Sequence, residues 1–176
     1  MRKKISVVSG LLAVVLLPAA LMLVAHHRLS PPLLKPGETL PTLQLKLERG
    51  QDTVAGPVRR VLILYKASCT HCQRTIRELT RLRTIHSDWF ATGSGISVDL
   101  IDISGKHTPL PDEVNIPFSI YWDERGQTEQ AFKGSLTPYV LFVNEKNIVQ
   151  YSRAGELTFD QEQRLFQNFY RTGYVL

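Results

Sequence analysis

The sequence predicts an α/β domain with a central mixed β-sheet flanked by helices, preceded by an N-terminal transmembrane helix. Three patterns indicate this fold class. An uncharged run occupies residues 5–25. A short apolar run at 61–65 leads into a stretch with helical spacing. Two apolar runs between 139 and 153, separated by a polar turn, lead into a second helical stretch.

The N-terminal run is 21 residues long, enough to cross about 30 Å of hydrocarbon as a helix. Arg2, Lys3 and Lys4 precede it and form the larger positive cluster, which predicts a cytoplasmic N-terminus. A cleaved signal peptide is the alternative, although its apolar part is usually only about 7–15 residues long. Both alternatives export residues 29–176. We therefore expect a single-pass protein of a bacterial inner membrane, with its C-terminal domain in the periplasm.

The chain divides into a membrane anchor at 1–28, an extended tether at 29–38 and a globular domain at 39–176. The tether contains three prolines and a glycine, a composition typical of linkers. Four of the 21 basic residues lie in the first 28 positions, and all 16 acidic residues lie beyond position 37. The exported part is therefore nearly neutral, and the formal charge of +5 gives no support to nucleic-acid binding.

Each element of the domain has a local pattern of its own. Residues 39–56 alternate apolar and polar side chains and then turn, which predicts a short hairpin. The run 61–65 is rich in strand formers and predicts a central strand buried on both faces. The later elements are a helix from about 73, a strand at 95–104, a loop at 105–118, a short helix within 123–134, strands at 139–143 and 148–153, and a helix at 157–174 opening at Thr158.

The two cysteines of the chain, Cys69 and Cys72, stand where the predicted strand at 61–65 passes into a helix. A bridge between them closes too short a loop to stabilise the fold much. The free N–H groups and the positive dipole end of a helix start favour the thiolate of Cys69. Cys72 lies one turn further along, within disulfide reach. We interpret the pair as a redox dithiol in which Cys69 attacks and Cys72 resolves.

Haem attachment and structural metal binding are two other uses of a cysteine pair. A haem-attachment motif requires histidine directly after the second cysteine, and Gln73 stands there instead. A structural zinc site usually has a second ligand pair of similar spacing, and none is present in the sequence. Copper or zinc binding through Cys69, His71 and Cys72 stays open as an alternative.

The stretch from about residue 40 to 170 resembles the thioredoxin superfamily, and specifically its membrane-anchored TlpA/ResA-like thiol–disulfide oxidoreductases. The segment "VLILYKAS" running into "CTHC" and the segment "GSLTPYVLFVNEKNIVQYSRAG" show the resemblance. It implies a thioredoxin-like fold in which Pro138 is a cis-proline opposite the dithiol. It also implies that backbone groups around Thr137 hold an incoming substrate chain, and that no dissociable cofactor is needed.

Three positions depart from the pattern of these relatives. Ser68 replaces the tryptophan usual before the first cysteine, Ile63 replaces the buried aspartate of thioredoxins, and Thr75 replaces the glutamate of ResA-like proteins. A carboxylate near the resolving thiol serves as a proton relay. The sequence therefore shows no evident group that would deprotonate Cys72.

The two residues between the cysteines, Thr70 and His71, are expected to tune the reduction potential. A protonated imidazole near the helix start favours the Cys69 thiolate, which stabilises the reduced form and makes the disulfide more oxidising. Strong oxidants of the DsbA type resemble this chain in having histidine at that position, with proline where Thr70 stands. The sequence thus predicts that His71→Ala makes the couple more reducing.

The leading functional hypothesis is a membrane-tethered periplasmic thiol–disulfide oxidoreductase, with the reductase direction favoured over oxidation. Its expected partners are exported proteins with thiols or disulfides, apocytochromes among them as the resemblance implies, and a membrane or soluble electron-transfer partner. No nucleic acid is expected, and we predict a monomer. The alternatives are a copper chaperone using the same cysteine pair and a redox-fold scaffold in an envelope assembly.

Overall fold

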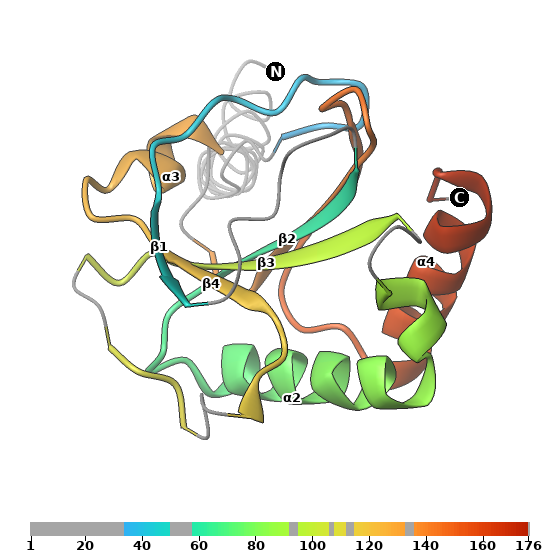
Figure 1. Cartoon of the computed structure of the whole chain (residues 1–176). Coiled ribbons are helices and arrows are strands. Elements are labelled where there is room, and N and C mark those ends of the chain that lie inside the picture. The colour runs from blue at the N-terminus through green and yellow to red at the C-terminus, as the bar shows by residue number, and fades with distance from the viewer. Residues whose placement is uncertain are drawn as a thin grey trace, which may run out of the picture. The chain divides into compact units, whose positions relative to one another are not determined.

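The computed structural model describes residues 34–49, 58–91, 95–105, 108–111, 115–132 and 136–175. In this part of the chain the strands form one six-stranded sheet in the order β1-β4-β3-β2-β5-β6 (Figure 1). The strands are β1 (Lys46–Arg49), β2 (Arg59–Tyr65), β3 (Ile96–Asp102), β4 (Ser119–Trp122), β5 (Tyr139–Val143) and β6 (Val149–Ala154). The helices are α2 (Thr70–Ile85), the 3₁₀-helix η1 (Ser87–Phe90), α3 (Gln127–Ala131) and α4 (Phe159–Thr172).

The sheet is mixed, as the sequence predicts. Strands β2, β3 and β4 run parallel to one another. β1 pairs antiparallel with β4, β5 with β2, and β6 with β5. The run 61–65 lies in β2 near the middle of the sheet, and all five of its residues are buried, which confirms a strand covered on both faces.

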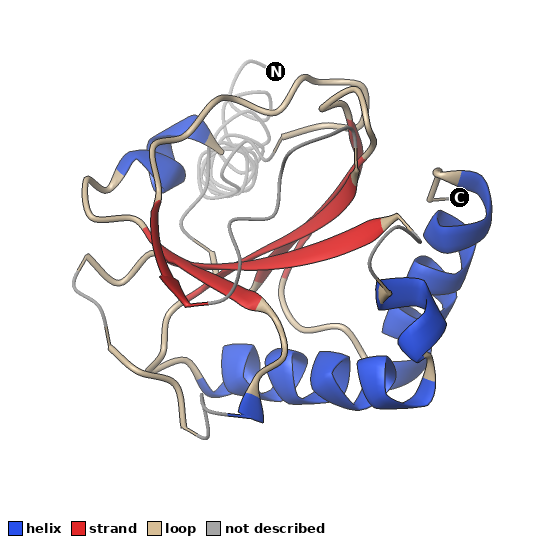
Figure 2. Cartoon of the chain, in the orientation of Figure 1, coloured by secondary structure: helices blue, strands red, loops and turns tan. Residues whose placement is uncertain are grey.

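Side chains of β2 alternate between two cores. Val61, Ile63 and Tyr65 belong to the core on the α2 and α4 side of the sheet. Leu62 and Leu64 belong to a second core on the opposite side, which also takes in Phe132 after α3 and Leu34 from the start of the described chain. Figure 2 shows α2 and α4 on one side of the red sheet and the short helix α3 on the other. The arrangement follows from the two-residue period of a strand.

Helix α4 has well-defined ends. Thr158 caps its first turn by accepting a hydrogen bond from the Gln161 N–H, while the Gln161 side chain accepts from the Thr158 N–H. This reciprocal pair satisfies two otherwise unpaired backbone donors, and it confirms the predicted start at Thr158. At the other end Gly173 adopts a φ of 73°, a left-handed conformation that glycine takes without steric cost.

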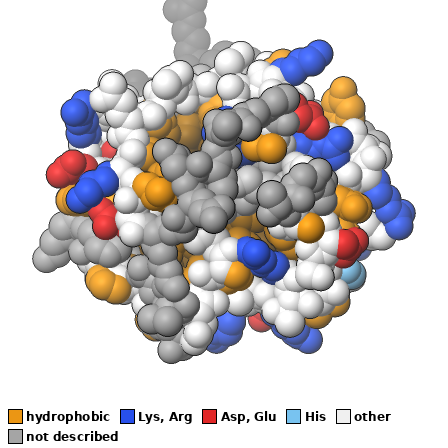
Figure 3. Space-filling view, viewed as in Figure 1, with side chains coloured by type: hydrophobic (Ala, Val, Ile, Leu, Met, Phe, Trp, Pro, Cys, Tyr) orange, Lys and Arg blue, Asp and Glu red, His pale blue; other side chains and the backbone are white. Residues whose placement is uncertain are grey.

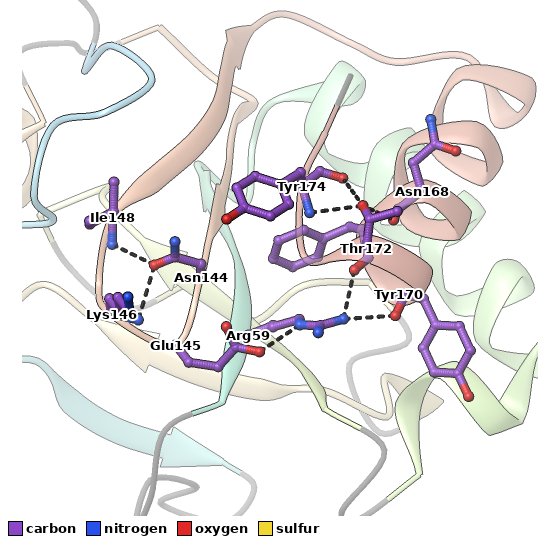
Figure 4. A network of polar contacts seen from close by, with 10 residues as sticks. Arg59, Asn144, Glu145, Lys146, Ile148, Asn168, Tyr170, Thr172 and Tyr174 are labelled. Carbon is purple, nitrogen blue, oxygen red and sulfur yellow. Dashed lines mark hydrogen bonds and ion pairs between the residues drawn. The ribbon is translucent and has the colours of Figure 1, made fainter.

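A single arginine fastens the C-terminal end of α4 to the sheet (Figure 4). Arg59 Nη1 donates to the carbonyl oxygens of Phe169 at 2.9 Å and Tyr170 at 2.7 Å, and its Nε donates to Glu145 at 2.7 Å. A guanidinium group is a suitable partner there because the last carbonyls of a helix lack helical donors and carry partial negative charge. The contacts join the start of β2, the β5–β6 turn and the end of α4.

Two elements differ from the sequence prediction. The strand β4 lies at the end of a stretch for which no strand was predicted. It is four residues long, and it is a strand because β3 and β1 pair with it on either side. In the predicted hairpin at 39–56, the described half contains β1, which pairs with β4, and the rest lies outside the described residues.

Residues 34–38, the last part of the predicted tether, lie against the domain. Leu34 is buried, its N–H donates to the Tyr139 hydroxyl at 3.0 Å, and the Gly37 N–H donates to the Val149 carbonyl at 2.8 Å. The predicted anchor at 1–28 lies outside the described residues. Among the helices that are described, none is both long and apolar enough to cross a membrane.

The surface of the domain carries charges of both signs. On the face shown in Figure 3, Lys and Arg side chains lie interspersed with Asp and Glu side chains, and small apolar areas separate them. This distribution agrees with the near-neutral charge balance of residues 29–176.

Candidate active site

Both cysteines lie at the junction of β2 and α2. Cys69 is the N-cap of α2, and its Sγ accepts a hydrogen bond from the Cys72 N–H at 3.4 Å. The turn that leads there is closed by the Cys69 N–H, which donates to the Lys66 carbonyl at 2.9 Å. A thiol at an N-cap replaces the usual hydroxyl or carboxylate oxygen and receives the backbone donors of the first turn. The structure therefore places the pair as the sequence predicts.

The two thiols have opposite environments. Cys69 is partly exposed, and although burial acts to raise its pKa, hydrogen bonds with Cys72, Thr137 and the His71 backbone bring that pKa below its ordinary value. Cys72 has no exposed surface, and burial followed by its hydrogen bond with Cys69 raises its pKa to about 12. At neutral pH Cys72 is therefore protonated, and Cys69 is the thiol that more readily forms a thiolate.

The loop before β5 lies against the dithiol. The Thr137–Pro138 peptide bond is cis, which confirms the expectation drawn from the family resemblance. The Cys69 thiol donates to the Thr137 carbonyl oxygen at 3.7 Å, a normal length for a sulfur donor. Behind the loop, the Gly155 N–H donates to the Pro138 carbonyl at 2.8 Å. The predicted residues Cys69, Cys72, Thr137 and Pro138 therefore meet at one place.

The two predicted tuning residues lie on the exposed side of the first turn of α2. Thr70 is exposed and begins the helix. The His71 side chain is 65% exposed, and its Nδ1 lies 2.7 Å from Glu156 Oε2. Toward Cys69, His71 contributes its backbone N–H. The imidazole is thus engaged by a carboxylate that sequence reasoning did not single out.

That carboxylate, Glu156, also binds Arg74. Arg74 Nη1 donates to both Glu156 oxygens, at 3.0 and 3.3 Å. The hydrogen bond with His71, reinforced by the charge of Arg74, lowers the pKa of Glu156 below its ordinary value despite partial burial. Glu156 is 85 residues from His71 along the chain, and its only sequence signal is its place directly after the predicted closing hairpin.

A second carboxyl group that the sequence did not reveal is buried in α4. Glu162 is 1% exposed, and in the described part of the chain neither of its oxygens has a hydrogen-bond partner. Burial, followed by the negative charges of Glu78 and Glu156, raises the pKa of Glu162 to about 9. Helical spacing could have indicated its burial, because Glu162, Phe166 and Phe169 recur at intervals of four and three.

A groove lies beside α2. A cavity of about 290 Å³ is lined by Gln73, Ile76 and Arg77 of α2 and by Leu110 and Ile116 across from them. Gln73 and Arg77 follow Cys69 at intervals of four residues, so they continue the stripe of the helix on which that thiol lies. The described residues contain no group of three or more His, Cys, Asp or Glu side chains arranged to hold a metal ion.

Comparison with family models and with curated proteins gives no match to the sequence. Solved structures do match. StoA from Bacillus subtilis is 14% identical with a TM-score of 0.54, over 69% of this chain and 92% of that one. The thioredoxin domain of a thiol–disulfide oxidoreductase from Bacteroides vulgatus is 13% identical with a TM-score of 0.57, over 78% and 99%. AhpC from Mycobacterium tuberculosis is 16% identical with a TM-score of 0.59, over 81% and 96%.

At these identities the similarity is one of fold. The shared features are those already described, namely a mixed central sheet with helices on its faces, and they span most of both chains in each comparison. This chain has the thioredoxin-like α/β fold.

Proposed function

We propose that the chain is a membrane-tethered thiol–disulfide oxidoreductase that acts on exported proteins, with Cys69 as nucleophile and Cys72 as resolving thiol. The main support is the asymmetry of the two thiols. One is partly exposed at a helix start with a lowered pKa, and the other is buried one turn further on with a pKa of about 12. A pair of this kind suits disulfide exchange, since one sulfur must attack the substrate disulfide and the other must stay protonated until the mixed disulfide has formed.

The proposed reaction has two exchange steps. The Cys69 thiolate attacks one sulfur of a substrate disulfide, the substrate S–S bond breaks, and the departing thiolate takes up a proton. Cys72 then loses its proton and attacks Cys69 Sγ in the mixed disulfide, which releases the second substrate thiol. The chain is left with a Cys69–Cys72 disulfide, and two electrons have passed to the substrate. A thiol donor, soluble or in the membrane, must restore the dithiol.

The Thr137–Pro138 loop and the groove along α2 are the proposed substrate contacts. Thr137 presents its carbonyl oxygen 3.7 Å from Cys69 Sγ, so a chain lying along this loop is beside the nucleophile. The groove begins four residues beyond Cys69 and has both apolar and basic lining. The membrane tether, the periplasmic location and the reductase direction rest on the sequence pattern of residues 1–28 and on the family resemblance.

The first test is the reduction potential of the full chain in detergent, measured by equilibration with glutathione or dithiothreitol buffers. A value near −270 mV, which is about that of thioredoxin, supports a reductase, and one near −120 mV indicates an oxidant. A dithiol that never equilibrates would overturn the oxidoreductase proposal and would favour a metal-binding or scaffold role.

A trapping experiment tests the assignment of the two cysteines. Cys72→Ser should accumulate a mixed disulfide between Cys69 and a substrate, because the resolving thiol is absent. Cys69→Ser is the matched control and should accumulate none. Equal trapping by both variants would contradict the roles given to the two thiols.

A further inference from the structure

We propose that Glu156 is a positioning residue that holds the His71 ring away from the Cys69 thiolate and so makes the dithiol more reducing than its CTHC motif alone would make it. The inference rests on the proposed function of the dithiol.

The carboxylate of Glu156 binds the first turn of α2 at two points. One oxygen lies 2.7 Å from His71 Nδ1, and the other accepts from Arg74 Nη1 at 3.0 Å. His71 and Arg74 are three residues apart and therefore share a face of the helix. The Glu156 side chain is 23% exposed, whereas that of His71 is 65% exposed. The less exposed partner thus directs the orientation of the more exposed ring.

The backbone around Glu156 is held on both sides. Before it, Gly155 has a φ of 94° and donates its N–H to the Pro138 carbonyl at 2.8 Å, which ties this segment to the loop opposite the dithiol. After it, Leu157 is buried in the core, and Thr158 caps α4. These contacts fix the backbone from which the Glu156 side chain extends.

The potential depends on how well the Cys69 thiolate is stabilised. Its present stabilisation comes from the helix start and from hydrogen bonds, including the Cys72 N–H at 3.4 Å and the His71 N–H. A cationic ring turned toward the sulfur would add to this and would make the disulfide more oxidising. A His71 ring bound to an ionised carboxylate stabilises the Cys69 thiolate less, because the negative charge of Glu156 balances the charge of the ring and the hydrogen bond sets the position of the ring.

A double-mutant cycle separates action through His71 from a direct effect of the carboxylate charge. The variants are Glu156→Gln, His71→Ala and the double variant, each as full chain in detergent. Glutathione equilibria are measured at pH 6, where a histidine side chain in solution is mostly protonated. Arg74 is present in all of the variants. Glu156→Gln frees Arg74 in both backgrounds, so the effect of this on the potential cancels when the two backgrounds are compared.

Glu156→Gln should raise the potential when His71 is present. The expected change in the equilibrium constant with glutathione is about two- to fivefold, or about 10–20 mV at 29.6 mV per tenfold. In the His71→Ala background, Glu156→Gln should change the logarithm of the glutathione equilibrium constant by less than half of the change seen when His71 is present. Equal shifts in both backgrounds, no shift in either, or a lower potential would each overturn the proposal.

Glu145→Gln is the matched control. It removes the same charge from another glutamate–arginine ion pair, at the β5–β6 turn beside Arg59. Arg59 begins β2 and Cys69 follows its end, so about 20 Å of strand separates them, beyond the screening length of physiological salt. No change is expected from this variant. If the wild-type dithiol does not equilibrate with glutathione, both the proposed function and this inference fail. If it does equilibrate but Glu156→Gln leaves the potential unchanged, only this inference fails.

Discussion

A single helical turn makes the two thiols chemically different. Cys69 is placed before the first turn, where backbone donors point at its sulfur, and Cys72 within it, where the core excludes water. The same motif on an exposed loop would provide neither environment. The difference between the environments of the two thiols is therefore a property of the strand–helix junction as much as of the cysteines.

Selective alkylation follows from this difference. At pH 7 iodoacetamide should modify Cys69 alone in the folded chain, because a thiol with a pKa of about 12 has only about one part in 10⁵ as thiolate. Tandem mass spectrometry locates the label. The Cys72→Ser chain should react as the wild type does, and the Cys69→Ser chain should react only once it is unfolded. Comparable rates for the two folded variants would contradict the assignment.

At the scale of elements, α4 is held at one end by its cap and at the other by Arg59. The Arg59 guanidinium makes two hydrogen bonds to terminal carbonyls and one to Glu145. These contacts join segments more than 80 residues apart in the chain. They fix the end of a helix whose other end adjoins Glu156.

Arg59→Ala should lower the free energy of unfolding by about 1.5–3 kcal/mol, the range for hydrogen bonds to a charged group. Urea unfolding followed by circular dichroism measures the change. Arg153→Ala is the control, since Arg153 is exposed on β6, and its effect should stay within about 0.5 kcal/mol. Equal effects of the two variants would show that the contacts at the end of α4 contribute nothing specific.

The buried Glu162 makes stability depend on pH. Its pKa of about 9 in the folded chain exceeds the ordinary glutamate value of about 4.3, so the folded state binds the proton more tightly. Its contribution is complete below pH 4.3 and is lost as the pH rises to about 9. Glu162→Gln should therefore flatten this fall in stability, by up to about 1.4 kcal/mol per pH unit.

Thermal unfolding of wild type and Glu162→Gln at several pH values between 5 and 9 measures the effect. Glu129→Gln is a suitable control, because the Glu129 side chain is 41% exposed and pairs with Lys66 at 3.2 Å. Parallel pH profiles for wild type and Glu162→Gln would contradict the buried, protonated state.

At the scale of the whole molecule, an aromatic cluster joins the sheet to α4 and η1. The ring of Phe166 lies 5.2 Å from that of Phe142 in β5 and 5.4 Å from that of Phe90 in η1. Phe169 meets Phe142 at 5.1 Å, nearly edge to face. Such edge-on contacts add to the burial of large apolar surfaces. The position of α4, and with it that of Glu156 and Glu162, depends on this cluster.

Phe166→Ala should lower the free energy of unfolding by about 3–5 kcal/mol, because it leaves a cavity at the centre of the cluster. Urea unfolding is again the measurement. Tyr174→Ala, at a position 59% exposed, is the control and should change stability by less than about 0.5 kcal/mol. A loss below about 1 kcal/mol for Phe166→Ala would show that the core closes around the gap.

Features that arise from neighbouring residues could be predicted from the sequence. The run at 61–65, the helix after Cys69, the hairpin before 154 and the start of α4 at Thr158 all follow from local periodicity and capping. The dithiol belongs to this group, since the spacing of its cysteines and their place after a strand are local facts. The cis bond before Pro138 came from the family resemblance.

Features that depend on residues far apart in the chain could not be predicted from the sequence and are seen in the folded structure. β4 is a strand through its pairing with β3 and β1, and Glu162 titrates unusually because α4 buries it. Glu156 meets His71 across 85 residues. Periodicity reports which face of an element is apolar, but not what packs against that face. The contacts of Glu156 with His71 and of Thr137 with Cys69 therefore come from packing between segments far apart in the chain, which no local pattern contains.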